Sequence, residues 1–216
     1  MLRVLLFCVA LVVSTAAQAA TVVWSATING FDMADGSDVA SGALVRIGTF
    51  DLTDDQIAQN SQNVPFLDGH FTEFGSTTIG SGGAPAGHFS AITTNNTATA
   101  SALAGSQIYV WAFSSGTVLG STQQGIFYMP KSSDVDWQFP SQVPIPDTTQ
   151  IGMDDLTDAT STNLRANAKV VIGAFGPGTS ATTGKPNFTL QAVPEPTSAT
   201  LLVAASGLIG LIRRRR

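Results

Sequence analysis

The residues best suited to metal chemistry form a short acidic loop near the N-terminus. Asp32, Asp35 and Asp38 are spaced three residues apart in the segment DMADGSD. Carboxylates at this spacing can supply oxygen ligands, and Ca²⁺ takes roughly six to eight of them. The segment does not follow the EF-hand pattern, and no glutamate closes it. Because Asp and Gly also favour turns, we interpret the segment first as a hairpin turn and keep its three aspartates as weak metal candidates.

Two histidines, His70 and His88, are the other side chains that could take part in catalysis. A hydrolase could pair either histidine with a carboxylate, and glycosidases use two carboxylates across a cleft. Acidic pairs such as Asp154-Asp155 are present, but nothing in the sequence places two aspartates across a cleft. The chain has no G-x-S-x-G nucleophile elbow, no H-E-x-x-H motif and no phosphate-binding loop. We therefore expect no catalytic activity and no required cofactor.

The three tryptophans could offer aromatic faces to sugar rings. Trp24 and Trp111 lie in apolar strand patterns, which predict both in the core. Trp137 lies between Asp136 and Gln138 and is the best candidate for an exposed platform. Large aromatic residues are usually buried, so the core is the favoured position for Trp137 as well.

The composition excludes some classes of protein. The chain has 216 residues, a net charge of −5 and only 12% charged residues, which suits one domain with tails. Ten residues are Lys or Arg and the last four residues are all Arg, which argues against a nucleic-acid binder. Between Ala20 and Val193 there are five basic and fourteen acidic residues, so this part should be soluble and should repel acidic polymers.

The N-terminus has the three parts of a secretory signal peptide. Arg3 provides a positive charge, Val4–Val13 is apolar, and Ala17-Gln18-Ala19 is a small-x-small cleavage site. We expect residues 1–19 to be removed by cleavage after Ala19. The only cysteine, Cys8, lies in this segment, so the mature chain would contain none. Disulfides and thiolate chemistry are then excluded.

The C-terminus also has three parts. A Val-Pro-Glu-Pro tetrapeptide precedes the uncharged segment Thr197–Ile212, and Arg213, Arg214, Arg215 and Arg216 follow it. A helix over the uncharged segment would span about 24 Å, slightly less than the ~30 Å of a bilayer's hydrocarbon core. Snorkelling arginines can make up this difference. Adjacent arginines stay on the cytoplasmic side, so the preceding domain would face away from the cytoplasm.

This tail resembles a PEP-CTERM sorting signal over residues 193–216. The motif falls on Pro194, Glu195 and Pro196, the membrane helix on residues 197–212 and the basic tail on residues 213–216. The resemblance implies an exported protein of Gram-negative-type bacteria, often ones that make exopolysaccharide. It also implies that an exosortase, a membrane-embedded cysteine transpeptidase, recognises and cuts the tail. A plain single-pass anchor is the alternative, although the Pro-Glu-Pro motif has no role in simple anchoring.

Residues 20–192 are expected to form a single all-β domain, a β-sandwich or jelly-roll-like fold with one or two short helices. Ile108–Phe113 is apolar on both faces, which predicts a central strand that is covered on both sides. Gly-, Ser-, Thr- and Pro-rich stretches at residues 75–87 and 176–186 predict loops. The other expected strands are Thr21–Ile28, Leu44–Phe50, His88–Thr93, Gly125–Tyr128, Ala168–Phe175 and Asn187–Leu190.

Two short helices are expected between the second and third of these strands. Thr53 and Gln56 have the spacing of a capping box, which predicts a helix within Asp51–Gln59. A second turn or short helix is expected over Pro65–Phe74, with Phe66 and Phe74 facing the core.

These features together predict an exported cell-surface or extracellular-matrix protein, of the kind found in biofilms. It would be held transiently in the inner membrane with its C-terminus in the cytoplasm, and its partner would be an exosortase. The alternative is a glycan-binding module of the exopolysaccharide matrix, with or without the help of Ca²⁺. A secreted hydrolase is a third hypothesis. An exposed aromatic side chain beside an acidic groove would favour glycan binding, whereas a pocket with His70 or His88 and a carboxylate would favour hydrolysis.

Overall fold

The structure is a computed structural model that describes residues 19–96, 102–131, 137–140, 147–157, 165, 167–179 and 186–193. The predicted signal peptide, apart from Ala19, lies outside these residues, as do the sorting motif, the membrane segment at residues 197–212 and the arginine tail. Among the described residues, no helix combines the length and apolar character needed to cross a membrane.

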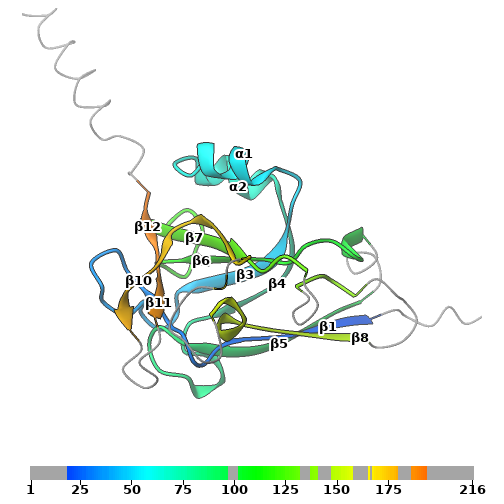
Figure 1. Ribbon diagram of the computed structural model, residues 1–216, viewed down its shortest axis with the longest axis horizontal. Coiled ribbons are helices and arrows are strands. Elements are labelled where there is room, and N and C mark those ends of the chain that lie inside the picture. The colour runs from blue at the N-terminus through cyan, green and yellow to red at the C-terminus, as the bar shows by residue number, and fades with distance from the viewer. Residues whose placement is uncertain are drawn as a thin grey trace, which may run out of the picture.

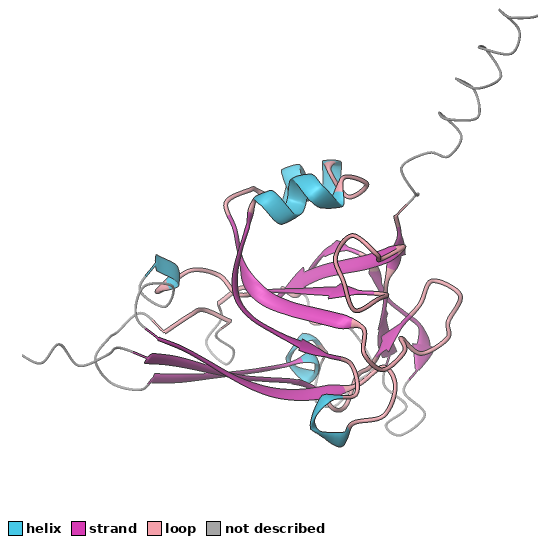
Figure 2. Cartoon of the chain, turned by 180° about the vertical axis from the view of Figure 1, so that it is seen from behind, coloured by secondary structure: helices cyan, strands magenta, loops and turns pink. Residues whose placement is uncertain are grey.

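The first sheet has three strands, in the order β5 (Phe89–Asn96), β1 (Ala19–Ala26) and β8 (Asp147–Gly152). β1 pairs antiparallel with β5 and parallel with β8. Side chains alternate along β1, so Val22 and Trp24 are buried while Val23 is only partly buried on the other face. Among the described residues, the two α-helices lie on the far side of the molecule from this sheet (Figures 1 and 2).

The second sheet is formed mainly by antiparallel neighbours. Its strands follow the order β12 (Gln191–Ala192), β7 (Gln123–Tyr128), β6 (Tyr109–Phe113), β3 (Leu44–Phe50) and β4 (Phe71–Thr78), and β9 (Lys169–Ile172) also pairs with β7. Every residue of β6 is buried. The prediction of a central strand covered on both sides is therefore confirmed.

Each face of this six-stranded sheet adjoins a hydrophobic core. Val110 and Ala112 of β6 face the main core, which also receives Trp24 from the three-stranded sheet. Trp111 and Phe113 of the same strand face a second core. The helices α1 (Asp54–Gln59) and α2 (Val64–Gly69) cover that second core, on the side away from the three-stranded sheet (Figure 1).

A third, small sheet joins segments from both ends of the domain. Its strand order is β10 (Ala174–Thr179), β11 (Pro186–Thr189) and β2 (Phe31–Asp32). The chain also has two 3₁₀ turns outside this sheet, η1 (Ser81–Gly83) and η2 (Met153–Leu156). β11 pairs parallel with β2, as β8 does with β1. The fold is thus mostly β-sheet with two short helices, as predicted. Its parallel pairs differ from a jelly roll, which is antiparallel throughout.

The local predictions for the helices are confirmed at one helix and corrected at the other. Thr53 caps α1, and Gln56 completes the predicted capping box. α2 ends at Gly69, whereas the sequence pattern predicted helical structure as far as Phe74. Phe74 is buried in the main core, but as part of β4. The pairing of β4 with β3, which lies more than 20 residues earlier, overrides the local pattern.

Two strand boundaries also differ from the prediction. β4 continues to Thr78, into the stretch expected to be a loop from residue 75. The strand expected over Ala168–Phe175 is divided into β9 and β10 at Gly173, whose φ is 100°. A Cβ at this glycine would lie 2.7 Å from both the Phe188 ring and the Thr189 carbonyl oxygen. Both the positive φ and the close packing require glycine here.

Candidate functional site

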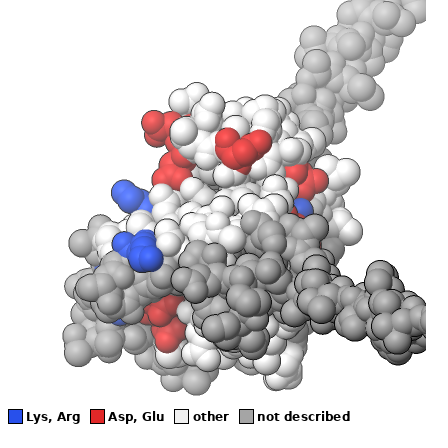
Figure 3. All heavy atoms as spheres, turned by 90° about the vertical axis from the view of Figure 1, so that its right-hand side faces the viewer, with Lys and Arg blue, Asp and Glu red and all other residues white. Residues whose placement is uncertain are grey.

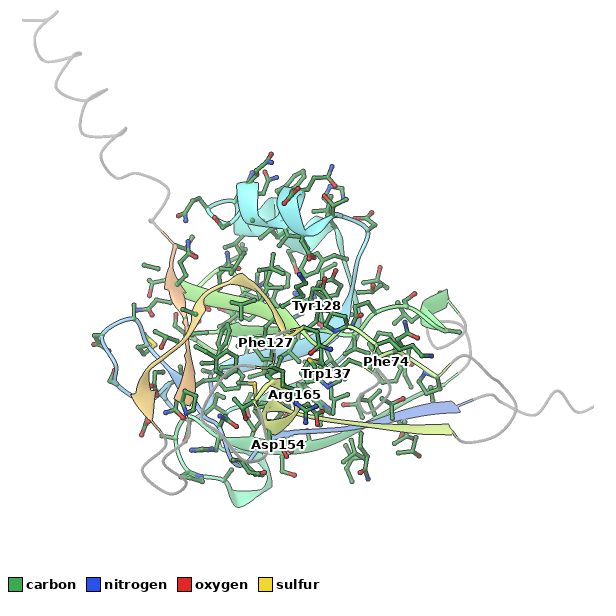
Figure 4. The ribbon with its side chains drawn as sticks, in the orientation of Figure 1. Phe74, Phe127, Tyr128, Trp137, Asp154 and Arg165 are labelled. Carbon is green, nitrogen blue, oxygen red and sulfur yellow. The ribbon has the colours of Figure 1, made fainter. Side chains whose placement is uncertain are left out.

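The three tryptophans do not offer a platform on the surface. Trp24, Trp111 and Trp137 are 1%, 0% and 1% exposed. Trp137 lies between the sheet that contains β1 and the six-stranded sheet (Figure 4). Its indole nitrogen donates a hydrogen bond to Asp155 Oδ2 at 2.8 Å. The predicted core positions of Trp24 and Trp111 are confirmed. Trp137 is also a core residue, so stacking of a sugar on its ring is excluded in this structure.

The two histidines belong to different parts of the molecule. His70 caps the C-terminal end of α2, where its Nδ1 lies 2.8 Å from Asp51 Oδ1 and its ring packs against Phe66. His88 Nδ1 lies 2.8 Å from the Ala26 carbonyl oxygen. Asp51 is largely exposed, and neither histidine lines the groove described below. Neither histidine therefore joins the carboxylates of that groove, as the hydrolase hypothesis would require.

The acidic loop forms the turn predicted for it. Met33 donates a backbone hydrogen bond to Ser37, and Asp32 and Asp38 form an isolated antiparallel bridge. Asp32 is 2% exposed and accepts a hydrogen bond from Asn187, and burial raises the pKa of its carboxyl. Asp35 instead accepts two hydrogen bonds from Ser37, which lower the pKa of its carboxyl.

These aspartates do not converge on one point. Among the described residues, no group of three or more His, Cys, Asp or Glu side chains is arranged to hold a metal ion. The buried Asp32 instead stabilises the pairing of β2 with β11, because it accepts a hydrogen bond from Asn187 of β11. Asp134 and Asp136 lie outside the described residues.

A shallow polar groove lies on the outer side of the three-stranded sheet. It has a volume of about 250 Å³ and is lined by Val23, Ser25, Gln150, Ile151, Gly152, Asp154 and Asp155. The parallel register sets Val23 beside Gln150 and Ser25 beside Gly152. η2 then places its two aspartates at the end of β8, and Figure 4 shows Asp154 near this sheet. Hydroxyl, amide and carboxylate groups thus share one concave surface.

The two aspartates of the groove have different environments. Asp155 accepts hydrogen bonds from the Trp137 indole and from the Gly152 amide, and burial raises the pKa of its carboxyl. Asp154 packs so closely that a Cβ at position 152 would lie 2.2 Å from its Oδ1. A larger residue at position 152 would push this carboxylate aside. The sequence provided the aspartate pair, but not the Ser25 and Gln150 that lie beside it, since β1 and β8 are far apart in the chain.

A second polar cluster ties α1 to the six-stranded sheet. Tyr109 and Tyr128 donate hydrogen bonds to the two carboxylate oxygens of Asp54, at 3.2 and 2.8 Å. Burial, together with the nearby Asp54, raises the pKa of Tyr128 to about 12 and raises the pKa of Tyr109 as well.

These two residues are the only tyrosines of the chain. The absorbance of ionised tyrosine therefore reports on this cluster alone. We expect the folded protein to form almost no phenolate at pH 10, where unfolded tyrosines are half ionised. Since both pKa values are raised on folding, stability is retained below pH ~10 and falls as the pH rises toward about 12. An ultraviolet titration with and without urea measures this difference. Equal midpoints for both states would contradict the expectation.

The last described residues bring the chain to one edge of the six-stranded sheet. Gln191 and Ala192 pair antiparallel with β7, and the Val193 amide donates a hydrogen bond to the Thr122 carbonyl at 2.8 Å. Val193 also packs against the second core. In Figure 1, β12 lies at the outer edge of the sheet beside β7. The Pro-Glu-Pro motif therefore begins one residue after the last backbone contact described in the fold.

The tail that follows matches a known sorting signal. Residues 192–216 match the PEP-CTERM protein-sorting motif, so the resemblance inferred from Pro194, Glu195 and Pro196 is confirmed. The motif implies an exported protein that is sorted at the membrane and processed by an exosortase. No curated protein and no solved structure matches the chain. The match covers the tail and, of the described domain, only Ala192 and Val193, so it carries no information on what the domain binds.

Proposed function

We propose that this chain is an exported surface or matrix protein without catalytic activity, which an exosortase releases from its membrane tail. The observation that carries the proposal is the PEP-CTERM motif directly after β12. The position of the motif supports it, because every strand that the structure describes precedes residue 193. Removal of the tail would leave the sheets and both cores complete.

The mass of the protein from the native cell surface or medium tests this proposal. We expect a mass that lacks residues 1–19 and the residues after the cleavage point in the Pro-Glu-Pro region. Additional mass would report an attached sugar or anchor. A protein that retains residues 197–216 would be a simple membrane-anchored protein, and the processing proposal would then be wrong.

Truncation should show that the domain is independent of its tail. We expect a chain ending at Val193 to unfold in urea within ~0.5 kcal/mol of the complete chain. A chain ending at Leu190 loses the β12–β7 pairing and the Val193–Thr122 hydrogen bond, and should be about 1–2 kcal/mol less stable. Equal destabilisation of both chains would mean that the tail contributes to the fold, contrary to the proposal.

Glycan binding is the second candidate, and the polar groove between β1, β8 and η2 favours it. Gln150 and Asp154 present amide and carboxylate groups that can bond to sugar hydroxyls. On the face seen in Figure 3, both acidic and basic side chains interrupt the uncharged part of the described surface.

Affinity electrophoresis in the native exopolysaccharide fraction tests this candidate. We expect retardation of the unchanged protein, at least tenfold weaker retardation of Gln150→Ala and Asp154→Asn, and no change for His70→Ala. Loss of retardation when a chelator is added would support glycan binding that depends on Ca²⁺. Equal mobility of all four proteins would exclude the groove as a glycan site.

A further inference from the structure

We propose that the loop between β6 and β7, residues 114–122, docks on the lipid bilayer that holds the tail, with Leu119 as its inserted tip. This inference rests on the proposed function, because it requires the tail to be anchored. The occupant is the phospholipid surface itself rather than a protein. Three features of the loop carry the argument: its position, its composition and its internal hydrogen bonds.

The position of the loop follows from its contact with the end of the fold. Thr122, at the base of the loop, accepts the hydrogen bond from Val193. Only residues 194–196 separate Val193 from the apolar segment, and an extended chain covers at most about 3.6 Å per residue. Val193 therefore lies within roughly 15 Å of the start of that segment. Leu119 is three residues from Thr122, so the same limit keeps the loop tip within about 11 Å of Thr122 and within reach of the membrane surface.

The composition of the loop suits an apolar surface. The segment SSGTVLGST contains no charged residue. Leu119 is 79% exposed, and the only other large hydrophobic residue with high exposure in the described part of the chain is Ile92, at 72%. Val118, next to it, packs against the second core, as Val193 also does. One side chain thus fixes the loop to the domain while its neighbour points away from the domain.

Several polar groups of the loop are paired within it. Ser115 and Ser121 bond to each other and to the Thr117 carbonyl, and Thr117 Oγ1 accepts a hydrogen bond from the Gly120 amide. The Ser121 amide bonds to the Val118 carbonyl, which closes a turn with Leu119 at its tip. Polar groups that are already paired cost little to bring to a lipid interface, whereas unpaired groups cost several kcal/mol. A hydroxyl-braced turn is therefore well suited to carry a leucine into the interface.

One leucine binds a membrane too weakly to act by itself, because single short apolar groups give only marginal affinity. Anchoring the tail makes this contact intramolecular, so its effective concentration is high. The contact would be lost when the exosortase removes the tail. We thus infer that Leu119 orients the domain on the membrane before processing, with the Pro-Glu-Pro region at the lipid surface.

A matched pair of labels tests the inference in the full chain carrying Cys8→Ser. Leu119→Cys and Ile92→Cys place one environment-sensitive fluorophore each at two similarly exposed positions, in the loop and in β5 of the other sheet. The proteins are reconstituted into vesicles of phosphatidylethanolamine and phosphatidylglycerol. We expect a severalfold emission increase with a blue shift at position 119, quenching by brominated lipid, and neither change at position 92.

Flotation of the vesicles separates this inference from the anchoring proposal. A chain that floats while the label at position 119 stays in water overturns the docking inference and leaves the anchor intact. Equal responses at both positions indicate general adsorption and also overturn it. A response at position 119 only in membranes that contain the exosortase would assign the loop to that enzyme instead. A chain that does not float overturns both the anchor and the docking.

Discussion

Replacement of Glu195 by Ala is expected to leave export intact and to abolish removal of the tail, so that the full tail mass remains on the protein. Glu195 is the charged centre of the Pro-Glu-Pro motif, and the flanking prolines fix the local φ and prevent a helix from continuing through it. Two prolines, one on either side of a carboxylate, form a suitable recognition element for a processing enzyme. Removal of the carboxylate should therefore block recognition without affecting the signal peptide.

The matched control for this variant is Gln191→Ala. Gln191 is an exposed residue of β12 outside the Pro-Glu-Pro motif, so its side chain should matter neither to the fold nor to processing. Intact mass and membrane fractionation of both variants give the result. Normal tail loss from the Glu195 variant would show that the motif is not what the exosortase reads, and a defect in both variants would indicate damage at the junction rather than lost recognition.

Replacement of Arg46, which is only 9% exposed, by Ala should lower the free energy of unfolding by about 2–4 kcal/mol. The Arg46 guanidinium lies 2.5 Å from carboxylate oxygens of both Asp68 and Glu73. It also lies over the rings of Phe71 and Trp111, 4.8 and 5.4 Å from their centroids. This one side chain therefore joins α2, β4 and the second core, and its loss breaks ionic and aromatic contacts together.

The exposure of the Asp68 and Glu73 carboxylates limits the loss of stability in Arg46→Ala. Their side chains are 41% and 38% exposed, so both can be rehydrated when the arginine is lost. We expect Arg46→Lys to retain part of the stability, because an ammonium keeps the charge but lacks the planar fork. Lys169→Ala, at an exposed position of β9, is the control and should change stability by less than ~0.5 kcal/mol. Urea unfolding that gives similar values for Arg46→Ala and Lys169→Ala would refute this account.

Predictions that depend on neighbouring residues agree with the structure. The continuous apolar run Ile108–Phe113 required a covered strand whatever its partners, since both faces are apolar. The capping box at Thr53 acts across three residues and forms as expected. The sorting motif is likewise a continuous segment. Each of these signals is complete within a short stretch of chain.

Predictions that depend on distant partners fail or are missing. β8 was not expected, because Asp147–Gly152 has little strand character and is stabilised by parallel pairing with β1. β4 replaced the end of a predicted helix for the same reason, through its pairing with β3. In each case tertiary packing outweighs the local preference.

The sequence by itself therefore determined that this protein carries a sorting signal and that its domain is built of strands. Both are local properties, because a sorting motif and an apolar run are each complete within a short segment. Only the tertiary structure decided which polar groups meet. It brought Ser25 and Gln150 together beside Asp154, and it placed Arg46 between Asp68 and Glu73. It also set Val193 against the base of the loop that carries Leu119. The physical reason is that strand register and sheet order arise from burial of segments far apart in the chain, which no short pattern of residues encodes.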